Sequence, residues 1–175
     1  MNRIQDIRNL SFEELALYFK ERGLPTFHAR QIFNWIYKKG IQQFDDMNNL
    51  SVSLREQLKN DFTFLPARVV QKKVAEDHTM KFLFELKDQQ KVETVLIPTA
   101  TRRTVCVSTQ AGCKFGCGFC ASGIGGWMRN LSCTEILEEI LFAKASSLGH
   151  ALSHIVFMGT GEPLDTVSLR WSLNF

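Results

Sequence analysis

The first 65 residues carry apolar side chains at helical spacing in three stretches separated by turn residues. Each stretch follows a residue that can cap a helix N-terminus. The predicted starts are Ser11 with its capping-box partner Glu14, then Thr26, then Ser51 or Ser53, and the predicted stops are Gly23 with Pro25 and Gly40. The side chains expected to face inward are Leu15, Leu17, Tyr18, Phe19, Phe27, Ile32, Phe33, Ile36, Tyr37, Val52, Leu54 and Leu58. We therefore expect a small helical domain over residues 1–65.

Between residues 66 and 98 the pattern changes from helical to alternating. Three runs rich in Val, Ile, Leu, Phe and Thr are separated by polar turns at 76–78 and 87–90. These runs, 67–75, 79–86 and 91–97, predict an antiparallel β-meander that links the helical domain to the rest of the chain. A fourth extended run follows at 104–108.

The remaining residues, 99–175, combine strand, loop, helix and strand in that order. Ser132 and Glu135 form a second capping box, and an apolar stripe follows until Gly149. The stripe consists of Ile136, Leu137, Ile140, Leu141 and Leu148. Residues 154–158 then predict a buried strand, parallel to the strand at 104–108 through a right-handed βαβ crossover. The predicted fold class is α/β.

Composition places the chain among ordinary globular proteins, with 45% hydrophobic and 22% charged residues. No run approaches the roughly 20 apolar residues of a membrane span, and the N-terminus has no apolar signal core. We expect a cytoplasmic protein without a membrane partner, in which thiols stay reduced. The net charge of +3 is too small to indicate a strongly basic protein, so any RNA would have to bind to local basic patches. One candidate patch on the second helix consists of Arg30, Gln31, Trp35, Lys38 and Lys39, which could equally be a solvated face.

Three cysteines, Cys113, Cys117 and Cys120, lie within eight residues at the spacing C-x3-C-x2-C. This spacing is typical of a metal site. A structural zinc ion wants four ligands, and no fourth Cys or His lies close by, whereas a [4Fe-4S] cluster can be held by three thiolates with its fourth iron open. The alternatives are a zinc site completed by Cys106 or Cys133, or a chance grouping.

Two glycine-rich segments follow the cysteines. Residues 123–127 indicate a flexible loop and lack the ending of a phosphate-binding loop. The second segment, Gly159-Thr160-Gly161-Glu162-Pro163, follows the second parallel strand and therefore lies at the same rim as the cysteines. Glu162 can accept a hydrogen bond from a cationic group there, although the motif alone could be a loop with an exposed carboxylate.

The cysteine spacing, with the aromatic Phe119 before the last cysteine, resembles the cluster loop of the radical S-adenosylmethionine (SAM) enzymes. The resemblance implies a [4Fe-4S] cluster on the three cysteines and SAM as cofactor. It also implies that Gly161 and Glu162 belong to the segment that holds the SAM amino group. In fold terms, it implies that residues 99–175 are the first βαβ portion of a truncated radical SAM partial (β/α) barrel.

Further segments, 92–95, 105–113, 129–131 and 159–163, together resemble the dual-specificity RNA methyltransferases that methylate C-2 of adenine. The family implies 23S ribosomal RNA and tRNA as substrates, a helical RNA-binding accessory domain, an external flavodoxin-like electron donor and a monomer. Cys106 matches the cysteine that resolves the covalent RNA adduct, and Glu93 matches the proton acceptor. Without the resemblance, Cys106 is a buried strand cysteine and Glu93 a surface carboxylate.

The resemblance stops near Asp165, and no cysteine follows Cys133. The family's methyl-carrying cysteine is therefore missing, and we expect this chain to lack turnover. The sequence leaves three alternatives open. These are methylation of adenine C-8, an iron-sulfur module without catalysis, and an RNA-binding remnant without a cofactor.

Overall fold

The computed structural model describes residues 5–64, 67–147 and 149–166. The chain divides into two compact units, Met1–Pro66 and Ala67–Phe175. The first unit is mainly helical, and the second is built on a β-sheet.

The first unit contains the three predicted helices, α1 (Phe12–Glu21), α2 (Phe27–Phe33) and α3 (Val52–Asp61). The second helix continues into a π-helical segment, η2 (Asn34–Lys38). Two short 3-10 turns, η1 (Ile7–Asn9) and η3 (Phe44–Asp46), lie in the segments between the regular elements. Strands β1 (Gln5–Asp6) and β2 (Phe62–Thr63) pair in parallel and bring the two ends of the unit together.

Two of the three predicted helix starts are confirmed. Ser11 Oγ accepts from Glu14 N at 3.1 Å while Ser11 N donates to Glu14 Oε2 at 2.7 Å, which completes the capping box. Ser51, rather than Ser53, caps α3 by accepting from Leu54 N. The prediction for Thr26 is wrong, because its backbone is already helical and its side chain makes no capping hydrogen bond.

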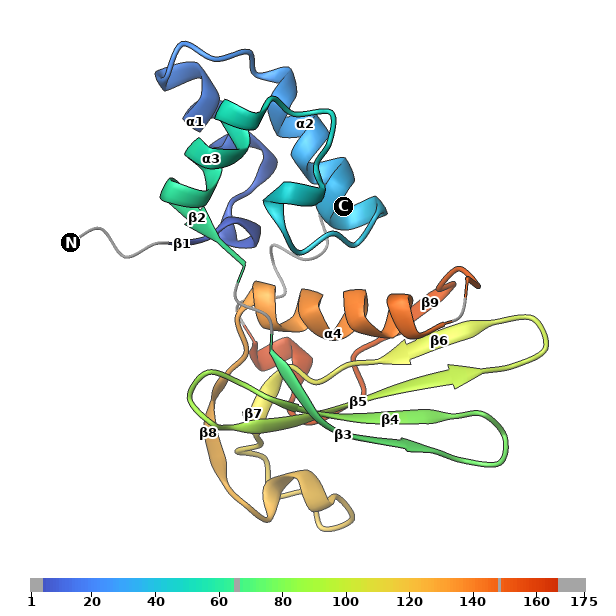
Figure 1. The fold of residues 1–175 in the computed structure, drawn as a ribbon. Coiled ribbons are helices and arrows are strands. Elements are labelled where there is room, and N and C mark those ends of the chain that lie inside the picture. The colour runs from blue at the N-terminus through green and yellow to red at the C-terminus, as the bar shows by residue number, and fades with distance from the viewer. Residues whose placement is uncertain (1–4, 65–66, 148, 167–175) are drawn as a thin grey trace. The chain divides into compact units, whose positions relative to one another are not determined.

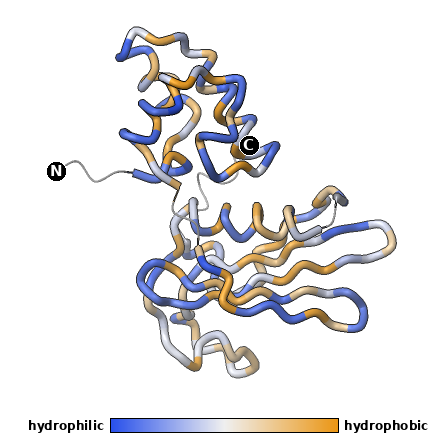
Figure 2. Tube along the Cα trace, viewed as in Figure 1, coloured by the Kyte–Doolittle hydropathy of each residue, from blue (hydrophilic) through white to orange (hydrophobic). Residues whose placement is uncertain are grey.

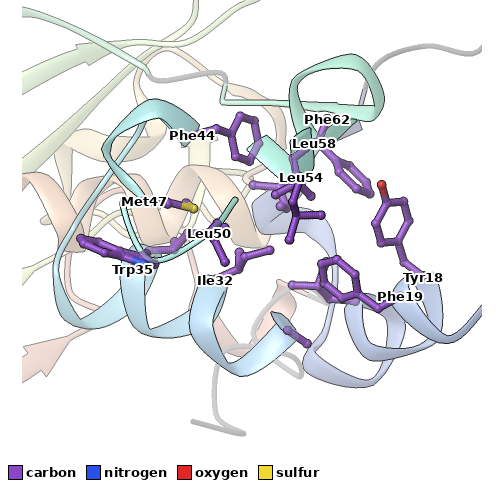
Figure 3. Packing of buried hydrophobic residues seen from close by; sticks show 14 residues of the cluster. Tyr18, Phe19, Ile32, Trp35, Phe44, Met47, Leu50, Leu54, Leu58 and Phe62 are labelled. Carbon is purple, nitrogen blue, oxygen red and sulfur yellow. The ribbon is translucent and has the colours of Figure 1, made fainter. Parts of the chain in front are cut away.

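A cluster of buried side chains from all three helices fills the first unit (Figure 3). The cluster includes Tyr18, Phe19, Ile32, Trp35, Ile36, Phe44, Met47, Leu54, Leu58 and Phe62. Three residues expected inside, Leu17, Phe27 and Val52, are exposed instead. Phe27 and Val52 are the first residues of their helices, and Leu17 lies only two residues from the buried Leu15, so it points to another face.

The second unit is built on one five-stranded sheet in the order β3-β4-β5-β6-β9. Its strands are β3 (Arg68–Val74), β4 (Met80–Glu85), β5 (Lys91–Pro98), β6 (Arg103–Cys106) and β9 (His154–Val156). The pairs from β3 to β6 are antiparallel, which confirms the meander, and β6 pairs with β9 in parallel as predicted. Because β5 pairs with β6, the meander and the βαβ segment share a single sheet.

Helix α4 (Cys133–Ser146) runs along one face of this sheet (Figure 1). Its capping box of Ser132 and Glu135 is confirmed. The helix and the sheet enclose a second apolar cluster that includes Phe82, Phe84, Val92, Leu96, Val105, Val107, Leu131 and Ile136. Figure 2 shows hydrophobic stretches along the strands of the sheet and a hydrophilic turn between β4 and β5.

The predicted burial of residues 154–158 is wrong. Ile155 is 46% exposed, and Met158 is also exposed. Strand β9 is only three residues long and pairs on one side with β6 alone, so it forms an edge of the sheet. The stripe residue Leu148 and residues 167–175, which follow the expected end of the resemblance near Asp165, lie outside the described residues.

After β6 the chain leaves the main sheet and forms a separate antiparallel hairpin of β7 (Gln110–Gly112) and β8 (Trp127–Asn130). A 3-10 turn, η4 (Ala121–Gly123), lies within the hairpin loop, and another, η5 (Pro163–Asp165), follows β9. In the part of the chain that the structure describes, no helix is long and apolar enough to span a membrane.

Candidate cofactor site at the ends of the parallel strands

All three motif cysteines lie on the loop of the β7–β8 hairpin (Figure 1). The loop is closed at its base by a hydrogen bond from Cys113 N to Gly126 O at 3.1 Å. Gly112 has a φ of +72°, and a Cβ at this position would overlap the carbonyl group of Gly126. The close approach of Gly112 to Gly126 therefore sets where the cysteine loop begins and ends.

The structure places the three cysteines on one loop but does not gather their side chains. Cys113 is buried, whereas Cys117 and Cys120 are exposed. Within residues 5–64, 67–147 and 149–166, no three His, Cys, Asp or Glu side chains are grouped closely enough to hold a metal ion. The donor set of three thiols on one short loop fits an iron-sulfur cluster in kind and number, but the loop would have to bring them together.

Three details of the loop bear on metal binding. Cys120 N donates to Cys117 O at 3.1 Å, which forms a turn between these two cysteines. Hydrogen bonds from Ser122 lower the pKa of the Cys120 thiol, which favours the thiolate that ligates metals. Phe119 is 95% exposed and contributes its ring to the loop surface rather than to the core.

The Gly159–Pro163 segment packs against the chain that leads from β6 into the hairpin. Gly159 N donates to Val107 O, and both Thr109 N and Gln110 N donate to Thr160 O. A Cβ on Gly159 would lie 2.6 Å from Ser108 Oγ, and one on Gly161 would lie 2.6 Å from the Cβ of Gln110. Gly161 also has a φ of +108°. The glycines are therefore required for this close backbone contact.

Glu162 is half-buried at the end of this segment. Its Oε1 accepts from Leu164 N at 3.0 Å, so the carboxylate caps the turn η5. Asp165, three residues on, forms an ion pair with Lys114 of the cysteine loop, with 2.8 Å between Oδ1 and Nζ. Hydrogen bonding to Lys114 lowers the pKa of Asp165. The cysteine loop is thus in direct contact with the turn that follows the glycine segment.

Cys106 and Glu93 lie on neighbouring strands of the main sheet. Cys106 is the cross-strand partner of Val95, and Glu93 is two residues from Val95, so both side chains belong to the face opposite α4. Burial raises the pKa of the half-buried Cys106 thiol. Glu93 forms an ion pair with Lys81 at 2.8 Å, and both side chains are about half exposed.

A buried carboxylate, Glu139 of α4, lies behind the site and was not predicted from the sequence. Its Oε2 accepts from Thr94 Oγ1 at 2.5 Å and from Ser108 N at 2.9 Å. Its Oε1 has no hydrogen-bond partner among the described residues. Burial raises the pKa of Glu139 to about 8. In the sequence, Glu139 is a glutamate next to the apolar stripe of the helix. That position alone does not show whether its side chain is buried or exposed.

Known proteins are similar to the chain over more than nine-tenths of its length. Residues 5–63 match the family described as "Ribosomal RNA large subunit methyltransferase N-terminal domain". The chain is 44% identical over 164 residues to a probable dual-specificity RNA methyltransferase RlmN from Halalkalibacterium halodurans, covering 93% of the chain and 45% of that protein. It is 47% identical over 162 residues to a probable dual-specificity RNA methyltransferase RlmN 2 from Protochlamydia amoebophila, covering 91% of the chain and 45% of that protein.

A solved structure agrees with these sequence relatives. The crystal structure of a radical SAM methyltransferase from Sphaerobacter thermophilus superimposes with a TM-score of 0.86 at 36% identity, covering 95% of this chain and 50% of that one. The chain therefore spans about half the length of the proteins it matches. Its fold is that of a radical SAM methyltransferase, and by sequence it belongs to the RlmN family, corresponding to the N-terminal part of its members.

Proposed function

We propose that these residues form the cluster-binding and SAM-binding part of a radical SAM RNA methyltransferase that acts on C-2 of adenine in 23S ribosomal RNA and tRNA. The observation that carries the proposal is the contact between the two motif regions. The cysteine loop and the Gly159–Pro163 segment follow the parallel strands β6 and β9, and Lys114 and Asp165 join them. A cofactor bound to one segment would then lie within reach of the other.

In this proposal Cys113, Cys117 and Cys120 hold a [4Fe-4S] cluster, and Glu162 accepts a hydrogen bond from the amino group of SAM. When bound, cluster and SAM supply the one-electron chemistry that an unactivated aromatic carbon requires. Because Gly161 has no side chain, its backbone can lie against Gln110. This contact fixes the position of the next residue, Glu162. The exposed ring of Phe119 provides an apolar surface beside the last cysteine.

Cys106 and Glu93 are proposed to act on the RNA rather than on the cofactor. Both belong to the sheet face opposite α4, which α4 leaves uncovered. Cys106 would resolve the covalent adduct with RNA, and its raised pKa means that a neighbouring base must take its proton first. Glu93 would accept a proton, and its ion pair with Lys81 would have to open for this.

The remaining assignments rest on the family resemblance alone. The helical unit is proposed to contact RNA, an external flavodoxin-like protein to deliver electrons, and the protein to act as a cytoplasmic monomer. The adenine C-8 alternative is not favoured, because the relatives carry the RlmN name.

We further propose that these 175 residues alone do not methylate RNA, since no cysteine follows Cys133 to carry the methyl group. The test is anaerobic incubation of the reconstituted chain with reductant, SAM and unmodified ribosomal RNA, followed by mass spectrometry of the nucleosides. We expect SAM binding, weakened at least about tenfold by Glu162→Gln because a charge-assisted hydrogen bond is lost, and no methylated adenine. Equal SAM affinity in the variant would contradict the role of Glu162, and repeated methylation would contradict the need for a further cysteine.

A further inference from the structure

The side chain of Gln110 is fully buried, and each hydrogen-bonding group of its amide has a different residue as its partner. Its Nε2 donates to Asn130 Oδ1 at 2.9 Å and to Asp165 Oδ2 at 3.0 Å. Its Oε1 accepts from Glu162 N at 3.1 Å. Both amide protons and the carbonyl oxygen are therefore used, and a buried amide with all its partners is held in one orientation.

These three partners belong to the elements that make up the candidate site. Asn130 is the last residue of β8, the arm on which the chain returns from the cysteine loop. Asp165 also pairs with Lys114 of the cysteine loop, and Glu162 is the proposed SAM ligand. Gln110 itself lies three residues before Cys113, on β7. One side chain thus contacts both arms of the cysteine hairpin and the glutamate-bearing segment.

Gln110 also contacts the glycine segment through its apolar atoms. A Cβ on Gly161 would lie 2.6 Å and 2.7 Å from the Cβ and Cγ of Gln110. The backbone of Gly161 therefore rests directly on the stem of the side chain whose amide holds Glu162 N. A residue that served only to fill space could be apolar here, but an apolar side chain would leave Glu162 N, Asn130 and Asp165 without this buried partner.

We propose that Gln110 is the positioning residue that fixes the Glu162 segment relative to the cysteine loop. It touches no cofactor itself and acts through Glu162, Asn130 and Asp165. The importance of this coupling for SAM rests on the proposed function. The coupling between the two segments does not, because it can be measured in the chain without cluster or SAM.

The test uses Gln110→Glu, which keeps the size of the side chain but replaces its two donor protons by a carboxylate oxygen facing Asp165. Adding Asp165→Asn restores a complementary pair, since the new amide at position 165 can donate to the new carboxylate at position 110 while its oxygen still accepts from Lys114, and the amide of Asn130 can rotate to donate. The matched control is Gln71→Glu, the same chemical change at an exposed position of β3. Circular dichroism of each variant verifies the fold.

The first readout is hydrogen exchange of residues 158–166 in the full chain without cofactors. We expect Gln110→Glu to speed exchange in this segment about tenfold or more, the double variant to restore most of the protection, and the control to change nothing. Unchanged exchange in Gln110→Glu, or no rescue by Asp165→Asn, would overturn the proposal. If Gln110→Glu unfolds the second unit, recovery of both fold and protection in the double variant supports the proposal, and recovery of neither overturns it.

The second readout is the affinity of the reconstituted chain for SAM. We expect Gln110→Glu to weaken SAM binding about tenfold and the double variant to recover it. If exchange follows the expected pattern but SAM affinity is unchanged, Gln110 does not position the SAM site. If the unsubstituted chain binds no SAM at all, the proposed function fails, while the exchange experiment still decides whether Gln110 couples the two segments.

Discussion

Replacing the buried Glu139 by glutamine should change how the stability of the chain depends on pH. Glu139 is 1% exposed, and its Oε1 has no partner among the described residues, so the protein stabilises the negative charge poorly. Burial raises its pKa from an ordinary value of 4.5 to about 8. Glutamine keeps an oxygen that can accept from Thr94 Oγ1 and Ser108 N, and it carries no charge at any pH.

The direction of the pH effect on stability depends on whether the folded or the unfolded state binds the proton of Glu139 more tightly. Between pH 4.5 and about 8, the folded protein keeps Glu139 protonated whereas the unfolded chain releases the proton. The stabilising contribution is therefore complete below pH 4.5 and is lost as the pH rises through about 8. Each pKa unit corresponds to about 1.4 kcal/mol, so the contribution lost is at most about 5 kcal/mol.

The measurement is urea unfolding of the original chain and of Glu139→Gln from pH 4 to pH 9, with the transitions of the two units analysed separately. We expect the free energy of unfolding of Glu139→Gln, relative to that of the original chain, to increase steadily as the pH rises above 4.5. This difference should become constant above about pH 8. The exposed Glu21→Gln serves as control. If the difference in unfolding free energy between Glu139→Gln and the original chain stays constant across this range, Glu139 does not have a raised pKa in the folded protein.

Three further predictions concern other parts of the chain. Gly161→Ala should destabilise the second unit by about 2 kcal/mol or more in thermal unfolding, because the φ of Gly161 is +108° and a Cβ there would meet Gln110. The control Gly125→Ala, where a Cβ would have no atom within 4 Å, should not destabilise it. Equal melting temperatures for the two variants would contradict this prediction. Arg129→Lys should lower the free energy of unfolding in urea by about 1 kcal/mol, because the Arg129 guanidinium donates to both carboxylate oxygens of Glu135, at 2.8 Å, and to both of Asp88. The control Arg68→Lys, at the exposed ion pair with Glu85, should change it by almost nothing. Equal losses in the two variants would count against a contribution from the arginine geometry. Reversing Lys38 and Lys39 to glutamate should weaken RNA binding and reduce its salt slope by about two phosphate contacts in anisotropy titrations, and reversing Lys72 and Lys73 on β3 should not; an unchanged slope in the first variant would argue against an RNA-facing second helix.

Features that depend on neighbouring residues could be predicted from the sequence. The capping boxes at Ser11 and Ser132 each need only a partner three residues on, and both formed as expected. The change to alternating runs at 79–86 and 91–97 likewise predicted the antiparallel strands β4 and β5. The parallel pairing of β6 with β9 followed from the order of elements.

Features that depend on distant residues could not be predicted. In the β7–β8 hairpin, Gly112 and Gly126 lie against each other at the base of the cysteine loop, and nothing local to either glycine indicates this. Gln110 is polar, so the sequence alone does not predict that it is buried. In the structure its amide is hydrogen-bonded to Asn130, Glu162 and Asp165, which lie far from it in the sequence. The exposure of Ile155 depends on what covers the edge strand β9, and its own apolar character indicated the opposite.

The content of iron, acid-labile sulfide and zinc per chain after anaerobic reconstitution shows directly whether the three loop cysteines hold an iron-sulfur cluster. We expect about four iron and four sulfide per chain, since three thiolates on one loop suit a [4Fe-4S] cluster. Alanine at any one of Cys113, Cys117 or Cys120 should abolish it, and Cys133→Ala should leave it intact. Stoichiometric zinc without iron, or a cluster that survives loss of any of the three loop cysteines, would contradict the assignment.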